Sequence, residues 1–220
     1  MREKKIHGNM DEQEKNRKLS EAEQRRLRAF EALAGDLEGQ DYRRVELTVS
    51  IVKANVFAVV LLIPLLIVGF GLFILKNRSV DLNPSPMGPV LFLVLLFALI
   101  VVHELIHGLS WSLFSENHWK DIEFGFMKQY LTPYCTCCVP LSKGQYIFGA
   151  LMPMIVLGIL PMIAGILMGS LSVLLMGVVM TDSAAGDLLI VWKLMRYRTR
   201  ADSIVYMDHP TQAGGVIFEK

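Results

Sequence analysis

The sequence predicts an all-α polytopic membrane protein with about four transmembrane helices and a small β-hairpin-like inner loop. Hydrophobic residues make up 53% of the 220 residues and mean hydropathy is +0.42, although 20% of residues are charged. These charges are segregated, because they crowd residues 1–50, whereas long stretches after Ala54 carry none. Such segregation excludes a disordered chain, a coiled coil and a single soluble core. With a net charge of +1 and no basic block, nucleic acid is not an expected partner.

Four apolar runs predict the membrane spans. The first, Ala54–Leu75, reaches about 30 Å at the rise of an α-helix, which matches the hydrocarbon thickness of a bilayer. The second covers residues 87–114. The third, Tyr146–Met168, contains two prolines that neighbouring helices can accommodate. The fourth, Leu171–Met195, follows after two residues, so the last two runs are expected to form a tight antiparallel hairpin.

Positive charges near the spans predict the orientation. Lysines and arginines gather before the first span, between the second and third, and after the fourth, whereas the loop between the first two spans holds Lys76 and Arg78. The positive-inside rule then places both termini in the cytoplasm. The lipid bilayer is the expected partner, and the oligomeric state is left open.

Residues 1–50 are predicted to form a cytosolic helical arm. Ser20 and Glu23 make a capping box, and apolar residues recur at helical spacing over residues 27–33 before Gly35, where the helix is expected to end. Two interpretations of this helix are open: it is a solvated helix leading into the first span, or it binds a membrane surface or a partner.

The pentapeptide His103-Glu104-Leu105-Ile106-His107 carries the chemistry. Histidines four residues apart project from the same face of a helix, so both imidazoles can bind one Zn²⁺. Glu104 follows the first ligand and can reach a zinc-bound water as general base. Inside an apolar span these side chains are costly unless they coordinate, pair or face a cavity. The motif therefore predicts a zinc site, although the same ligand types can hold iron or cobalt.

A catalytic zinc site needs a third protein ligand beside the two histidines. The candidates are Asp182 and Asp187 in the fourth run, and Glu116, His118 and Glu123 in the inner loop.

The inner loop, residues 115–145, holds the predicted substrate-binding strand. Ile122, Phe124 and Phe126 alternate along a segment that can pair with residues 130–132. An extended substrate can add to such a strand through main-chain hydrogen bonds.

Three cysteines follow in the same loop. Pro133 and Pro140 bracket Cys135, Cys137 and Cys138 and predict an irregular turn there. A reducing cytosol favours free thiols, and the alternative is a structural zinc bound by the C-x-C-C pattern.

Several short segments around the motif share the pattern of a known family. They are His103–Gly108, Pro133–Cys137, Pro140–Ser142, Gln145–Tyr146, Gly149–Pro153 and Gly186–Ile190. In these segments the chain, from about Tyr42 to Met195, resembles the putative zincin peptidase family of small bacterial membrane proteins. That family is distantly similar to the site-2 proteases, which are intramembrane metalloproteases. The resemblance implies an integral protein of the bacterial plasma membrane.

The resemblance also implies a division of roles. His103 and His107 are the zinc ligands, Glu104 is the base and Asp187 is the third ligand. Depth supports Asp187, because it lies about 12 Å from the inner end of its span, and His107 lies about 10 Å from the inner end of its own.

We therefore expect a zinc-dependent, membrane-embedded peptidase that acts on membrane or membrane-proximal proteins or peptides. The expected division is a helical arm over 1–50, a transmembrane metallopeptidase-like domain over 51–196 and a cytosolic tail over 197–220. The alternative is a non-enzymatic accessory or sensor subunit with a structural or regulatory metal. Glu104 discriminates between them, because hydrolysis requires a carboxylate beside the ligands and a structural site does not.

Overall fold

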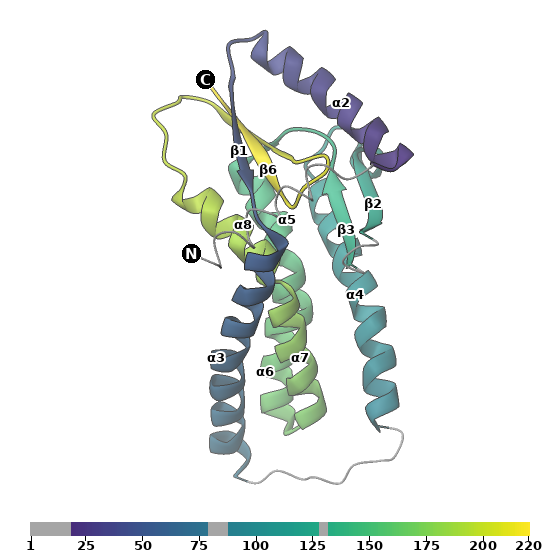
Figure 1. Ribbon diagram of the computed structural model, residues 1–220. Coiled ribbons are helices and arrows are strands. Elements are labelled where there is room, and N and C mark those ends of the chain that lie inside the picture. The colour runs from purple at the N-terminus through teal and green to yellow at the C-terminus, as the bar shows by residue number, and fades with distance from the viewer. Residues whose placement is uncertain (1–18, 79–87, 128–131) are drawn as a thin grey trace, which may run out of the picture.

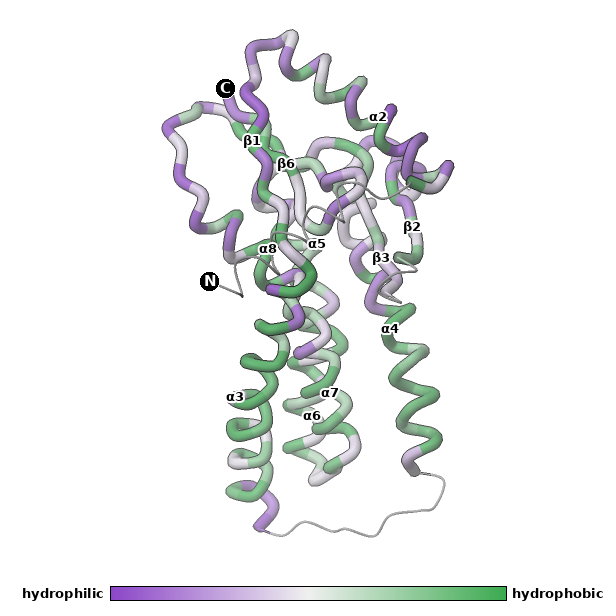
Figure 2. Tube along the Cα trace, in the orientation of Figure 1, coloured by the Kyte–Doolittle hydropathy of each residue, from purple (hydrophilic) through white to green (hydrophobic). Residues whose placement is uncertain are grey.

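The structure, a computed structural model, describes residues 19–78, 88–127 and 132–220. Apolar helices form one half of the molecule, and a helix and strands of more polar composition form the other half (Figures 1 and 2). The predicted start of the second span at Met87 lies outside the described residues.

Three helical stretches are long and apolar enough to cross a membrane. They are α3 (Ile51–Asn77), α4 (Gly88–Ser112) and the stretch Lys143–Met168. A fourth is present if α7 (Leu171–Ser183) and α8 (Ala185–Arg196), which meet at 47°, cross as one bent span. The prediction of about four spans thus corresponds to three, or to four with the bent pair.

The third stretch is divided where its prolines lie. It consists of α5 (Lys143–Pro153), the π-helical segment η2 (Met154–Ile159) and α6 (Leu160–Met168). A capping box of Ser142 and Gln145 starts α5. A π segment between two prolines is one of the local adjustments by which such helices continue through a membrane.

Four short strands form a sheet at one end of these helices, and this corrects the expectation of an all-α chain. The strands are β1 (Arg43–Thr48), β4 (Leu141–Ser142), β5 (Ile204–Asp208) and β6 (Gly214–Glu219), in the antiparallel order β1-β6-β5-β4. The β1–β6 pair joins the segment before the first apolar helix to the last strand, with Arg43 opposite Glu219. Pairing across such a sequence separation leaves no local pattern in the sequence.

The N-terminal helix α2 (Glu21–Glu38) covers this sheet, as Figure 1 shows. Its capping box is present as predicted. Phe30 and Ala34 are buried against strand residues, notably Phe218. The apolar face therefore packs on the chain's own sheet, which replaces both interpretations of this helix. The predicted end at Gly35 was wrong, because tertiary packing of the last turn outweighs the low helix propensity of glycine.

The inner loop contains a hairpin of β2 (Ile122–Met127) and β3 (Thr132–Cys137), preceded by the 3₁₀ turn η1 (His118–Asp121). The first strand is confirmed. Its predicted partner began at residues 130–131, which lie outside the described residues. The irregular turn expected between the two prolines is present only after Cys137, because Pro133 sits in a two-stranded sheet whose edge needs no amide donor from it.

Candidate metal centre

Three side chains meet where α4 passes the start of α8. The Nε2 atoms of His103 and His107 lie 3.1 Å apart, and Asp187 Oδ2 lies 3.4 Å from the first and 3.5 Å from the second. Both histidines are buried. The structure thus brings together the two histidines of the motif and one of the five candidates for a third ligand.

The break between α7 and α8 positions the aspartate. The chain bends at Ala184, and Asp187 lies in the first turn of α8. The depth argument assumed a straight fourth span, and that assumption was wrong. Asp187, in the first turn of α8 just after this bend, reaches both histidines, so the expected pairing is present.

The ring of His107 is held in place from its far side. Its Nδ1 lies 2.9 Å from the carbonyl oxygen of Gly149, so that Nδ1–H donates to this oxygen and Nε2 is left with a free lone pair. Trp111 stacks on the ring with centroids 5.0 Å apart and planes 14° apart. This is the arrangement that orients a metal-binding histidine.

Close approach of α5 to α4 depends on Gly149. A Cβ at this position would lie 2.1 Å from Nε1 of Trp111. Trp111 itself donates this N–H to the carbonyl of Tyr146, at 3.2 Å. Any larger residue at position 149 would push apart the two helices that orient His107.

The spacing of the three ligand atoms fits a zinc ion. Zinc holds nitrogen and oxygen ligands at about 2.0–2.1 Å in a tetrahedron, which places neighbouring ligand atoms about 3.4 Å apart. The three observed separations, 3.1, 3.4 and 3.5 Å, lie close to this value. The donor set of two imidazoles and a carboxylate, with a fourth position open, is that of a catalytic zinc site.

Glu104 reaches the adjacent strand of the hairpin. The backbone of Cys135, in β3, hydrogen-bonds to the Glu104 side chain. Glu104 lines the same cavity as the three ligand side chains and lies against β3, a position from which a carboxylate can accept a proton during hydrolysis.

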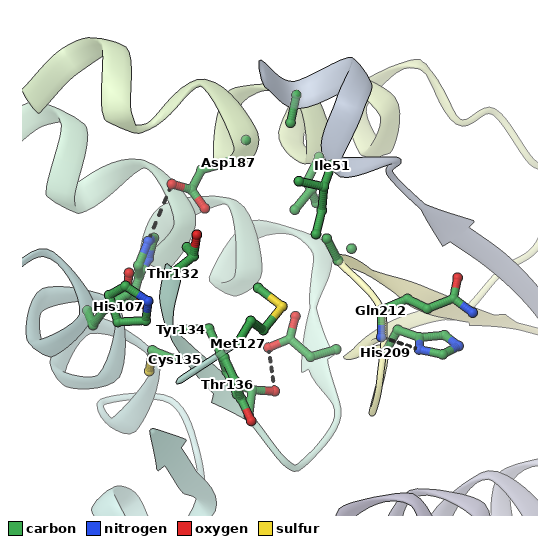
Figure 3. Close-up of a pocket in the computed structure, with 18 of the residues that line it drawn as sticks. Ile51, His107, Met127, Thr132, Tyr134, Cys135, Thr136, Asp187, His209 and Gln212 are labelled. Atoms are coloured by element: carbon green, nitrogen blue, oxygen red, sulfur yellow. Dashed lines mark hydrogen bonds and ion pairs between the residues drawn. The ribbon is translucent and has the colours of Figure 1, made fainter. Parts of the chain in front are cut away.

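A cavity of about 450 Å³ opens beside these residues (Figure 3). Its wall includes the ligands, Glu104, the start of α3 and the loop between β5 and β6. The hairpin contributes Met127 and the residues of β3 from Thr132 to Thr136. Ile122, Phe124 and Phe126, predicted to bind substrate, are not among the described residues that line this cavity.

Asp208 in β5 is a residue of this cavity that the sequence analysis missed. Its Oδ2 accepts a hydrogen bond from the Cys137 backbone at 2.9 Å and one from the Thr136 hydroxyl at 3.1 Å. Burial raises the pKa of its carboxyl to about 6, although these hydrogen bonds act in the opposite direction. Asp208 is the last residue of a strand that the sequence did not predict, so nothing in its local pattern marks it.

The other candidates for the third ligand lie elsewhere. Asp182 lines the same cavity but is outside the three-residue cluster. Glu123 lies 3.6 Å from Arg26, and Nδ1 of His118 hydrogen-bonds to the Ser112 carbonyl at 2.8 Å. Glu116 is exposed.

The three cysteines are free, as expected. Burial raises the pKa of the Cys137 and Cys138 thiols to about 12 and moves that of Cys135 well above its usual range. Among the described residues the cluster that could hold a metal is His103, His107 and Asp187, so the structure gives no support to a zinc site at the C-x-C-C pattern.

The fold and the site define a chain with membrane-length apolar helices and a zincin-type HExxH helix whose two histidines meet an aspartate. Residues 96–201 match the family described as "Putative zincin peptidase", which is the family that the motifs of the sequence resemble. The matched segment starts later than the expected Tyr42 and leaves α3 outside it. Comparison with curated proteins and with solved structures found no match.

Proposed function

We propose that the protein is a zinc-dependent peptidase embedded in a membrane, acting on membrane or membrane-proximal polypeptides. The observation that carries this proposal is the spacing of 3.1 to 3.5 Å among His103, His107 and Asp187. The adjacent Glu104 favours hydrolysis over a structural metal, because a structural site has no use for an acid beside its ligands. Zinc, when bound, would supply a Lewis acid that polarises a peptide carbonyl and makes water more acidic.

Glu104 has the role of general base and then general acid. Its carboxylate accepts the proton of a water molecule as that water attacks the carbonyl carbon of the peptide bond. The same proton then passes to the amide nitrogen as the C–N bond breaks, and the second proton of the water stays on the new carboxyl group, which leaves a carboxylic acid and an amine. His107 keeps its orientation throughout, because its Nδ1–H stays on the Gly149 carbonyl.

We assign the substrate-holding strand to β3 and no longer to the β2 residues that the sequence suggested. The pairing of β2 and β3 is antiparallel, and in such a pair every second residue directs its amide away from the partner strand. Cys137 N–H points to Asp208, and Cys135 contacts Glu104, so this edge of β3 faces the site. An extended peptide along this edge lies beside the ligands and would donate its amides to carbonyl oxygens of β3, because the amides of Cys135 and Cys137 are already bonded.

The test is cleavage of a mixed library of membrane-protein peptides by the full chain in proteoliposomes. Glu104→Gln is expected to retain zinc and to lose cleavage by about 10²–10⁴-fold, the usual contribution of a general base. Zinc content measured on the same preparations is the control. Metal-dependent cleavage that is equal in Glu104→Gln and the unsubstituted protein contradicts the proposal.

A further inference from the structure

The outer face of β2 is apolar and exposed, although it contributes nothing to the described cavity wall. Phe124 is 47% exposed and Phe126 is 53% exposed. Trp119, in η1, is 48% exposed and stacks on Phe124 with centroids 6.2 Å apart. Three neighbouring aromatic side chains half open to the surroundings need a partner outside the chain as described.

This aromatic face is continuous with the apolar surface of α4. A Cβ on Gly108 would lie 2.7 Å from the Phe124 ring and 3.1 Å from Trp119, so both rings rest against the helix at this glycine. A stripe of exposed leucines lies beside Gly108. At about 100° per residue, these leucines are 60–140° further around the helix than the glycine. The stripe consists of Leu105, Leu109 and Leu113, which are 44%, 50% and 64% exposed.

We propose that the outer face of β2 and Trp119 is a bilayer contact, inserted at the boundary between lipid headgroups and acyl chains. The occupant is lipid, because the face continues the surface that α4 turns toward the hydrocarbon. Tryptophan collects at this boundary, where its amphipathic ring meets both environments, and phenylalanine and leucine form the apolar faces that insert beside it. The inference rests on the membrane embedding within the proposed function and is independent of peptidase activity.

Such a contact fixes the depth of the strand beside the candidate metal centre. Phe124 is paired with Cys135 across the hairpin, and the Cys135 backbone hydrogen-bonds to Glu104. A bilayer surface that fixes the depth of Phe124 therefore also fixes the depth of the β3 edge beside Glu104. Polypeptides that reach this edge are then those lying at the membrane surface.

The experiment measures quenching of tryptophan fluorescence by lipids that carry a bromine or a nitroxide at a known depth. The full chain is reconstituted in phosphatidylcholine and phosphatidylglycerol vesicles, with Trp119→Phe and Trp192→Phe as background and the buried Trp111 as a constant signal. Phe126→Trp is the probe. We expect a blue-shifted emission that shallow quenchers reduce more strongly than deep ones.

Two matched variants in the same background keep the result interpretable. Phe97→Trp, at a position 67% exposed on α4, reports whether the helices are in the bilayer, and Ala32→Trp, exposed on α2, reports a position outside it. Quenching of the Phe126→Trp probe several-fold above Ala32→Trp supports the inference. A probe no more quenched than Ala32→Trp, while Phe97→Trp is quenched, overturns it. An unquenched Phe97→Trp overturns the membrane embedding on which it rests.

Discussion

The helical bundle (α3, α4, the stretch 143–168, α7 and α8) and the polar cap (α2, β1, β4, β5 and β6) bury their apolar residues in opposite ways. In the bundle, only 11% of the apolar stretch of α3 and 6% of that of α4 is buried. In the cap, Tyr206, Ile217 and Phe218 are fully buried. The cap is packed as a water-soluble fold, whereas α3 and α4 of the bundle turn most of their apolar side chains outward.

This difference teaches where each part of the candidate metal centre comes from. The bundle supplies His103, His107 and Asp187, whose positions depend on close helix contacts. Strand β5 of the cap supplies Asp208, which holds β3 against the cavity. Ligand geometry is therefore a property of the bundle, and the placement of the strand beside Glu104 depends on the cap.

The largest expected effect comes from removing a bundle ligand. Asp187→Ala should weaken zinc binding by more than about 100-fold, because loss of a direct ligand exceeds the 10–100-fold cost of a supporting contact. Zinc bound per chain after equilibration with a competing chelator measures this. Asp182→Ala, which removes an aspartate of the same cavity wall that lies outside the three-residue cluster, should keep its zinc. Zinc loss in Asp182→Ala but not in Asp187→Ala would reverse the assignment.

A smaller effect is expected from loosening the bundle without touching a ligand. Gly149→Ala places a methyl group where Nε1 of Trp111 lies 2.1 Å away, and overpacking of this kind costs about 1–3 kcal/mol. It also displaces the carbonyl that orients His107, so zinc affinity should fall by roughly 10-fold.

Gly144→Ala on the same helix is the matched control, because a Cβ there meets nothing within 4 Å. Thermal denaturation in detergent measures the stability of each variant, and zinc titration measures its zinc affinity. If the two alanine variants behave alike, close helix contact does not orient His107, and the comparison of bundle with cap loses its main support.

The smallest effect on zinc binding is expected from a substitution in the cap. Asp208→Ala removes the acceptor for the Cys137 amide and should lower stability by about 1–3 kcal/mol. Cleavage should fall because β3 is less well placed, while bound zinc is unchanged. Asp208→Asn keeps one acceptor oxygen, so its stability and cleavage should lie between those of Asp208→Ala and the unsubstituted protein. Loss of zinc in Asp208→Ala would show that the cap also determines ligand geometry.

Asp208 also predicts a pH dependence that can be tested by substitution. Folding raises the pKa of its carboxyl from 3.8 to about 6, so the folded chain binds more protons than the unfolded chain between these values. The contribution of this carboxyl to stability therefore falls as pH rises from about 4 to about 6. As pH rises through this range, the melting temperature of the unsubstituted protein should therefore fall relative to that of Asp208→Asn. A constant difference contradicts the predicted pKa.

The sequence by itself determined the features whose cause is local. Long uncharged runs specify membrane-length helices, because every backbone group in hydrocarbon must bond within the helix. Two histidines four residues apart share a helix face whatever surrounds them, and Ser20 with Glu23 specifies the start of α2. The short motifs that carried the family resemblance are equally local, and the family match confirmed them.

Only the tertiary structure decided the features that join distant segments. The pairing of β1 with β6 depends on a register between the two ends of the chain. The bend at Ala184, which carries Asp187 to the histidines, arises from packing that no single span encodes. The assignment of the cavity strand to β3 follows from which strand edge meets α4. Periodicity reports which residues share a face, whereas contact between elements depends on how those faces pack together.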